Sequence, residues 1–328
     1  MRRMGLIAAA ALTLSAWATG VSAEETTAPL AVYGNRQTIE LAPVLLAADT
    51  FYPGPAEVRM GGIPNLVGEP GAPGFADPGE ADLATNAETQ LLRFSVRHAD
   101  LRIIFNVTEG LYRIVARKSA GIASVADLKG KRVATIEQTS SGYFLHLMLA
   151  REGLSFDHIT AVSMVPLSDM TKALANREVD AVVIWEPESE NSLRALGDDA
   201  IEFSGEGIYS ELFNLNSTAE KLADPAKRKA IVRFVRAVID ATAALKQDPT
   251  EAQRLVVAAS GFSAENVAES WQHHRWNASI LPQTLDVMVL QEQWLASREN
   301  RAPRSREQLA TLIDTSIVAE ALALEPAR

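Results

Sequence analysis

The sequence contains no cysteine among its 328 residues. Without cysteine the chain can form no disulfide, no thiolate metal site, no cysteine nucleophile and no lipid-modified cysteine. Histidine is scarce too, and no pair among the five has the i, i+4 spacing of a zinc-binding helix; they are His98, His146, His158, His273 and His274. The sequence therefore predicts neither a metal site nor a cofactor.

Long basic runs and common catalytic motifs are also missing. The formal net charge is −10, so nucleic acid is not an expected partner. Neither a Gly-x-Ser-x-Gly elbow nor a Walker loop occurs. His273 and His274 would point to different sides of a helix, so at most one could reach a shared ligand. We therefore expect a binding protein and not an enzyme.

The first residues have the pattern of a signal peptide. Arg2 and Arg3 precede an apolar run from Gly5 to Trp17, and the segment ends in the small residues of Val21-Ser22-Ala23. A membrane anchor is the alternative, but it needs about 20 apolar residues without small-residue breaks. No later segment reaches that length either. We expect cleavage after residue 23 and a periplasmic protein without a lipid anchor.

The remaining length and pattern predict an α/β protein of more than one lobe. The chain is too long for one compact core of average size. From Ala126 onward, short β-branched runs alternate with helical periods, which is typical of βαβ units around a parallel sheet. The run from Asp180 to Trp185 is apolar after its first residue, which indicates a strand covered on both faces. We expect it to be an interior strand.

Two further regions differ in composition. The segment from Tyr52 to Gly79 is dense in glycine and proline, which cannot propagate a helix, so we interpret it as mostly loop. From Asp224 the chain becomes helical, with Asp224 as cap and Pro225 in the first turn. Further helical segments are expected at residues 249–259, 263–274, 283–298 and 305–322.

One strand-to-helix joint carries small polar residues. The strand in "GKRVATIEQ" is followed by Thr139, Ser140, Ser141 and Gly142, and then by an apolar-periodic helix. Such a joint presents unpaired amides, hydroxyls and the positive end of the helix dipole, which together could hold an anion. The alternative is that Ser141 only caps the helix. The motif alone does not separate these two interpretations.

Other polar motifs follow predicted strands in the same way. Trp185 and Glu186 come after the interior strand, at the end where open α/β sheets bind ligands. "NAET" at residues 86–89 and "VTEG" at residues 107–110 have similar places in the first half of the chain. Trp185 could equally be a core residue, and Glu186 an acid at a helix start. We expect four loops facing one cleft.

These segments carry a family resemblance. "GIASVADLKGKRVATIEQTSSGYFLHLMLAREGL" and "VPLSDMTKALANREVDAVVIWEPESENSLRALG" resemble the solute-binding proteins of ABC importers for nitrate, sulfonates, taurine and thiamine-pyrimidine precursors. "ADLKGKRVA" and "VDAVVIWEP" are the most specific pieces. One departure is "GGIPNLVGEPGAPGFADPGEADLAT", where relatives usually carry a helix after the Gly-Gly pair, so the first-lobe side of the pocket could be reshaped.

The resemblance implies two Rossmann-like lobes of the type II periplasmic binding protein, or Venus-flytrap, architecture, with a helical C-terminal tail. The implied division is a signal peptide at 1–23, lobe 1 at 27–116, lobe 2 at 117–211 and a return to lobe 1 at 212–328. The crossing segments would be "LYRIVARK" and "ELFNLNST". A monomer is expected, with the permease subunits of an importer as its partners.

The resemblance also implies ligand contacts. Thr139, Ser140 and Ser141 match the loop that holds the ligand's anionic head, and Tyr143 or Trp185 would contact its body. By position, the expected site also includes Glu186, Asn86, Glu88, Thr108, Glu109, Tyr112 and Arg36.

Three acids of this set bear on the ligand. Glu88, Glu109 and Glu186 would repel a plain anion, so we expect an organic anion or zwitterion such as a sulfonate or taurine. An aminopyrimidine thiamine precursor, another small carboxylate or nitrate is the alternative. A periplasmic sensor partner is a further alternative, and a pyrimidine-synthase-like enzyme would lack its cysteine-rich motif. These glutamates could also simply face solvent.

Overall fold

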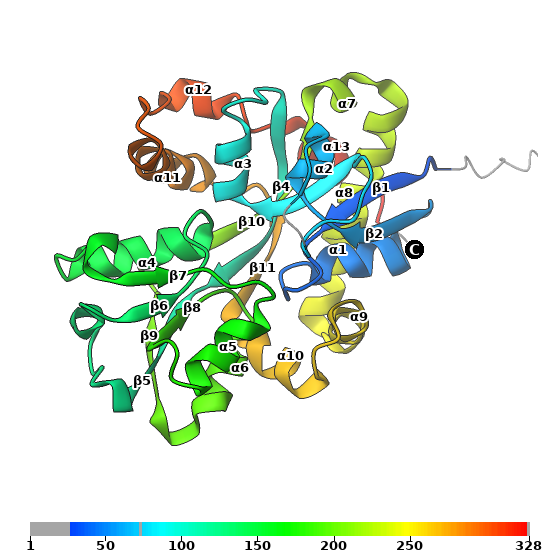
Figure 1. The fold of residues 1–328 in the computed structure, drawn as a ribbon. Coiled ribbons are helices and arrows are strands. Elements are labelled where there is room, and N and C mark those ends of the chain that lie inside the picture. Colours follow the sequence, from blue (N-terminus) through cyan, green and yellow to red (C-terminus); the bar gives the residue numbers. More distant parts are fainter. Residues whose placement is uncertain (1–26, 72–73, 327–328) are drawn as a thin grey trace, which may run out of the picture.

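The computed structural model describes residues 27–71 and 74–326. The predicted signal peptide lies outside the described residues. No helix in the described part of the chain is long and apolar enough to cross a membrane. Within that part, the strands form two separate sheets (Figure 1).

The first sheet runs in the order β11-β4-β10-β3-β1-β2. Its strands are β1 (Leu30–Gly34), β2 (Ala56–Met60), β3 (Leu83–Ala87), β4 (Leu101–Leu111), β10 (Ser210–Thr218) and β11 (His274–Ser279). β1 pairs in parallel with both β2 and β3, whereas β10 pairs antiparallel with β3 and β4. The sheet is therefore mixed, with a parallel half formed by the N-terminal strands.

The second sheet runs in the order β7-β6-β8-β5-β9. Its strands are β5 (Arg113–Arg117), β6 (Arg132–Ala134), β7 (Thr160–Val162), β8 (Ala181–Val183) and β9 (Ala200–Ser204). β6 pairs in parallel with β7 and β8. β8 is fully buried at the centre of the sheet, which confirms the interior strand predicted from its continuous apolar run.

The chain passes between the sheets at two joints. Tyr112 separates β4 from β5, and residues 205–209 separate β9 from β10. The boundaries expected from the sequence, after residues 116 and 211, fall inside β5 and β10. The two joints lie side by side, because Gly205 donates its amide to the Tyr112 carbonyl at 2.9 Å.

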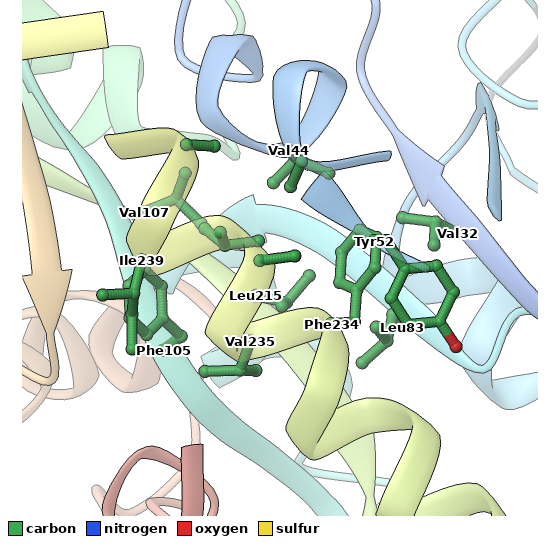
Figure 2. Packing of buried hydrophobic residues seen from close by; sticks show 14 of the residues in the cluster. Val32, Val44, Tyr52, Leu83, Phe105, Val107, Leu215, Phe234, Val235 and Ile239 are labelled. Atoms are coloured by element: carbon green, nitrogen blue, oxygen red, sulfur yellow. The ribbon is translucent and has the colours of Figure 1, made fainter. Parts of the chain in front are cut away.

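Helices cover one face of the first sheet with the largest apolar cluster. These are α1 (Ala42–Leu46), the π-helical turn Ala47–Phe51, α7 (Ala219–Ala223), α8 (Pro225–Gln247), α9 (Thr250–Ser260) and α13 (Ser316–Leu322). The α8 residues Phe234, Val235 and Ile239 pack over Phe105 and neighbouring strand residues (Figure 2). Asp224 caps α8 by accepting from the amides of residues 226 and 227, as its sequence predicts.

Other helices cover the opposite face. They are α2 (Ile63–Val67), α3 (Glu88–Phe94), α11 (Thr284–Arg298) and α12 (Arg306–Ala310). On the second sheet, α4 (Ser140–Arg151) covers one face, and α5 (Ser168–Ala175) and α6 (Glu188–Leu196) cover the other. α10 (Ala264–Ser270) packs against α6. Single 3-10 turns lie at Lys118–Ala120, Val125–Leu128, Phe156–His158, Gly197–Asp199 and Trp271–His273.

The described part of the segment from Tyr52 to Gly79 is mostly loop, as predicted, although the residues between its prolines also form the short elements β2, which pairs with β1, and α2, which packs on β3. Two other local predictions were wrong. The helix expected at 263–274 ends at Ser270 as α10, and β11 begins at His274, where it pairs with β4. The "VTEG" segment is no loop, since β4 continues through it to Leu111 and pairs there with β10.

Glycine at position 142 is required by close packing at the start of α4. A Cβ placed on Gly142 would lie against the backbone carbonyl of Glu137, closer than van der Waals contact allows. A backbone atom cannot rotate away as a flexible side chain can. Gly142 therefore lets the first turn of α4 sit directly on the loop that follows β6.

Replacing Gly142 with alanine is expected to destabilise the fold by about 1–3 kcal/mol, the usual cost of overpacking a close contact. Thermal unfolding should show the midpoint lowered by several degrees. Gly153→Ala is the matched control at the other end of α4, because a Cβ there has open space but the residue must keep its φ of 69°. A smaller loss for Gly142→Ala than for Gly153→Ala would contradict the packing argument.

Candidate functional site

A cavity of about 420 Å³ lies where the two sheets face each other. Its lining includes residues that directly follow the parallel strands of both sheets: Asn35 after β1, Gly61 and Gly62 after β2, Asn86 and Ala87 at the end of β3, Ile136 after β6, Ser163 after β7, and Trp185 after β8. The carboxyl ends of parallel strands are where open α/β sheets bind ligands. The cavity is therefore the candidate site.

Much of the cavity wall is apolar and aromatic. The apolar side chains come from both halves of the molecule and are those of Pro64, Pro70, Phe75, Phe94, Ile136, Val165, Trp185 and Phe213. Aromatic faces of this kind favour flat or apolar ligand groups. The polar lining is made by Asn35, Glu40, Asn86, Gln90, Arg93, Gln138, Thr139, Ser140, Ser163 and Glu211.

Hydrogen bonds join the two sides of the cavity. On one side of the cavity, Gln90 and Arg93 donate hydrogen bonds to Gln138. Gln90 Nε2 donates to the Gln138 carbonyl at 3.1 Å, and Arg93 Nη1 donates to the same carbonyl at 3.2 Å. Arg93 Nη2 donates to Gln138 Oε1 at 2.7 Å. Elsewhere, the Trp185 indole donates to the Gln37 carbonyl at 3.2 Å. These contacts connect elements of the first sheet with loops of the second, so the structure holds a closed arrangement.

Two carboxyl groups, Glu40 and Glu211, form the acid pair of the cavity. They are 3% and 2% exposed, they line the cavity, and they hydrogen-bond to each other. Burial raises the pKa of Glu40 to about 7. Burial and the nearby Glu40 raise the pKa of Glu211 well above its ordinary value. Such a pair holds a shared proton near neutral pH, because two adjacent buried carboxylates repel each other.

Hydroxyl groups surround the acid pair. Thr38 Oγ1 donates to Glu40 Oε2 at 2.7 Å, and the Tyr112 hydroxyl donates to Glu211 Oε2. The Tyr112 hydroxyl also contacts Ser140 Oγ at 2.8 Å. The acid pair is thereby linked to the first turn of α4 and to the joint between the sheets.

The cavity brings together four of the residues predicted from sequence. Asn86, Thr139, Ser140 and Trp185 all line it. Asn86 comes from β3, and its Oδ1 accepts the amide of Ile63 at 2.7 Å, which fixes the start of α2. The residues of the polar joint therefore lie where an anion cradle would need them.

The structure does not show Ser141 as the helix cap. Thr139 has the cap position, without a side-chain bond to the helix, and its Oγ1 donates to the Ile136 carbonyl at 2.7 Å. Ser141 Oγ is buried behind Thr139, within 2.8 Å of its hydroxyl. Helix geometry leaves the first amides of α4 without intrahelical acceptors. Those amides and the Ser140 hydroxyl are what the joint offers to a ligand.

Three further predicted residues lie behind the cavity wall. Tyr143 packs against Tyr209 and Trp294. Glu186 is buried in an ion pair with Arg113 at 2.9 Å. Glu88 is fully buried, where it accepts from the Tyr209 hydroxyl at 2.7 Å and from the Leu212 amide at 2.9 Å. None of these three side chains is part of the cavity lining as described.

The last four predicted residues also lie outside the lining of the described cavity. Thr108 is buried in β4 and donates to the Glu40 carbonyl at 2.9 Å, while Glu109 pairs along β4 with β10 and β11. Tyr112 reaches the site through Glu211 and Ser140, as described above. Arg36 turns away, because its Nε donates to the Ala259 carbonyl at 3.2 Å.

Several residues that line the cavity were not predicted from the sequence. Glu40 lies in the loop after the first strand, six residues beyond the end of β1, and Glu211 lies in β10, inside the segment interpreted as a crossing. Gln90 and Arg93 belong to α3, and Gln138 directly precedes Thr139. Gln138 and Asn35 follow predicted strands, so their positions in the sequence could have identified them as lining residues. Nothing local marks Glu211, whose role depends on the pairing of β10 with β4.

The described residues include no group of three or more His, Asp or Glu side chains placed to hold a metal ion. The acid pair and the helix N-terminus are thus the charged features of the cavity, together with Arg93. They can bind charged or hydrogen-bonding groups of an organic ligand.

The buried acids make stability depend on pH. Burial and nearby Glu211 raise the pKa of Glu88 to about 8 from its ordinary 4.5. Between pH 4.5 and about 8, Glu88 keeps its proton in the folded chain but releases it in the unfolded chain, so the free energy of unfolding falls as pH rises. Burial lowers the pKa of His274 to about 3, which opposes this trend below about pH 6.5. His274 does not oppose the acids between pH 6.5 and 8, so this is the window in which their effect is measured.

We expect Glu88→Gln to flatten the fall in stability between pH 6.5 and 8, because glutamine does not ionise. The slopes of the free energy of unfolding against pH should differ between the variant and the wild type by at most about 1.4 kcal/mol per pH unit. Chemical denaturation at several pH values measures it. Glu57→Gln is the control, since Glu57 is exposed on β2 and should leave the slope unchanged. Equal slopes for Glu88→Gln and the wild type would contradict the raised pKa.

Known proteins resemble this chain in sequence and fold. A binding protein of Brucella abortus is 31% identical over 145 residues, covering 43% of this chain and 39% of that protein. An aliphatic sulfonates-binding protein of Escherichia coli is 28% identical over 184 residues, covering 55% of each. The chain thus spans between two fifths and just over half of these curated relatives' length.

Solved structures agree on the fold. The alkanesulfonate-binding protein of Xanthomonas axonopodis pv. citri, bound to MOPS, has a TM-score of 0.67 at 20% identity, covering 88% of this chain and 99% of that one. The model of the NMT1/THI5-like family matches residues 70–252, more than half of the chain. With the fold of a periplasmic binding protein and this match, the chain belongs to the NMT1/THI5-like family.

Proposed function

We propose that this chain is the exported substrate-binding component of an ABC importer. It captures a small organic molecule in the cavity between its lobes and delivers it to the permease in the membrane. The observation that carries the proposal is the cavity itself, because both sheets contribute strand-end loops to its lining. The names of two similar proteins describe the binding of sulfonates, which supports the binding role.

Closure around the ligand is the proposed mechanism. The lobes are joined at Tyr112 and at residues 205–209, and they touch across the cavity through Gln138 and Trp185. A ligand that contacts both lobes favours the closed state over the open one. The permease then receives only the closed form, which carries ligand.

The proposed ligand is an organic anion or zwitterion of the sulfonate or taurine type. Its acidic head would meet the first amides of α4 and the Ser140 hydroxyl, where the helix dipole favours negative charge. Its body would lie against Trp185 and the other apolar lining. The aromatic lining also favours the second candidate, an aminopyrimidine, whose ring could stack on Trp185.

The remaining parts of the proposal concern location and assembly. Residues 1–23 would direct export to the periplasm and be removed there. The mature protein would act as a monomer that binds its ligand without chemically changing it. The lobes would be residues 27–111 with 210–326, and residues 113–204.

The test is to recover the ligand that the protein takes up. The full chain, expressed with its leader, is purified under native conditions and denatured, and the released small molecules are identified by mass spectrometry. Small-angle scattering before and after adding the recovered compound measures closure. A stoichiometric small molecule and a more compact particle are expected. Absence of any bound compound would refute the binding role, and a recovered compound that leaves the scattering unchanged would refute closure.

We expect Gln138→Ala to weaken ligand retention about fivefold. The substitution removes the side-chain oxygen that accepts from Arg93 across the cavity, one charge-assisted bond at an exposed position, worth about 1 kcal/mol. The rate of ligand release from the native complex measures the loss. Gln247→Ala, at the exposed end of α8, is the control. Release at the wild-type rate from Gln138→Ala would show that this contact does not hold the cavity closed.

A further inference from the structure

The charges around the cavity are unbalanced. Among the described lining residues, Arg93 is the cation, and its guanidinium already donates to Gln90 Oε1 at 3.2 Å and to both oxygens of Gln138. The acid pair, in contrast, accepts hydrogen bonds from hydroxyl groups, Thr38 to Glu40 and Tyr112 to Glu211, and no cation of the described residues forms an ion pair with it. Hydroxyl donors stabilise the ionised form of a carboxyl group.

Keeping both Glu40 and Glu211 ionised in the buried part of the cavity costs free energy. Two carboxylates in contact, nearly free of solvent, need a positive partner or a shared proton. The surrounding acids add to the repulsion, because Glu88 and Glu186 also raise the pKa of Glu40. Arg113 offers no compensation here, since Glu186, Glu190 and Glu202 hold its guanidinium. If the pair gives up its shared proton, no cation in the described part of the chain is placed to replace that positive charge.

We propose that the ligand's buried end is a cationic nitrogen group, such as an ammonium, an amidinium or a protonated amino-heterocycle, bound between Glu40 and Glu211. This inference rests on the proposed function and specifies the part of the ligand that selects it. The aromatic side chains of Trp185, Phe75 and Phe213 line the same cavity and suit a cation beside an apolar body. A plain anion is rejected, because it would meet the acid pair.

Binding of the cation displaces the proton that the acid pair shares. The carboxyl proton is released to solvent, and the N–H groups of the ligand then donate hydrogen bonds to the carboxylate oxygens. The groups facing the pair are Tyr112 from the joint, Thr38 from the loop after β1, Ser140 from α4, Glu88 from α3 and Glu186 from the loop after β8. Of these, only the acids titrate near neutral pH.

Affinity for a cation should therefore rise with pH. Because burial raises the pKa of both acids, each displaced proton makes binding up to about tenfold tighter per pH unit for as long as the free pair is still protonated. An anion that needed the protonated pair as hydrogen-bond donor would show the opposite trend. The sign of the pH dependence thus separates the two kinds of ligand.

The experiment uses probes matched in shape and different in charge. Benzamidine, benzamide and benzoate present a cation, a neutral group and an anion on the same ring. 3-Aminopropane-1-sulfonate, propylamine and propane-1-sulfonate separate an ammonium from a sulfonate, and both amines stay protonated up to pH 8. Titration calorimetry with the mature protein at pH 6, 7 and 8, in buffers of different ionisation enthalpy, gives affinity and protons released. We expect the probes with a positive nitrogen to bind, releasing up to one proton near pH 6.

Variants of Glu40 and Glu211 test whether these two carboxyl groups bind the cationic probes. Glu40→Gln and Glu211→Gln should each weaken binding of the cationic probes at least tenfold at pH 8 and remove the pH trend. Glutamine resembles the protonated carboxyl group, so folding is expected to persist, and circular dichroism checks it. Glu188→Gln is the matched control: Glu188 is a buried acid on α6 with a raised pKa, it lies outside the cavity lining, and its loss should leave probe affinity within about twofold.

The outcomes are distinct from those that test the importer role. Binding of benzoate or propane-1-sulfonate in preference to the cations would overturn the cation site and leave a ligand-binding protein. Failure of every cationic probe to bind, or undiminished binding in both glutamine variants, would also overturn it. The importer role itself depends on recovery of a native ligand and on closure, which these probes do not decide.

Discussion

The hydrogen bonds of the Tyr112 hydroxyl connect every part of this structure that function requires. Tyr112 is the residue at which the chain first leaves one sheet for the other, and its hydroxyl reaches Glu211 on the returning strand β10 and Ser140 at the start of α4. A buried hydroxyl must keep its partners, because losing one costs about 1–3 kcal/mol. The joint, the acid pair and the helix N-terminus are therefore constrained together.

This constraint explains why the site is built from such distant pieces. β10 brings Glu211 beside Glu40 because it runs antiparallel between β3 and β4, whereas Glu40 lies in the loop after β1, the middle strand of the parallel half. Gly110 lies against both carboxyl groups, and a Cβ there would press on Glu40 Oε1 at 2.6 Å. The acid pair is thus packed against β4, while the loops that carry Gln138 and Trp185 supply the opposite wall.

Sequence patterns predicted those features that local chemistry determines. The apolar run of β8, the Asp224 cap of α8 and the polar joint at Thr139 and Ser140 each have a short-range physical cause, and the structure has all of them in place. Features that depend on long-range pairing could not be found in this way. β11 was hidden within a helix-like period, and Glu211 looked like any strand residue. Glu88 and Glu186 illustrate the converse: both follow strand ends, yet tertiary contacts with Tyr209 and Arg113 bury them behind the wall.

A closed cavity with an unbalanced acid pair gives the ligand a thermodynamic role. Closing the empty protein near neutral pH removes Glu40 and Glu211 from water without a counter-charge, so the pair must retain a proton or the lobes must stay apart. The few contacts across the cavity, such as those of Gln138 and Trp185, are polar and partly exposed, and such bonds are individually weak. They do not offset that cost by themselves. A ligand that brings positive charge to the acid pair removes the penalty, so the same interaction that selects the ligand also makes the closed state favourable.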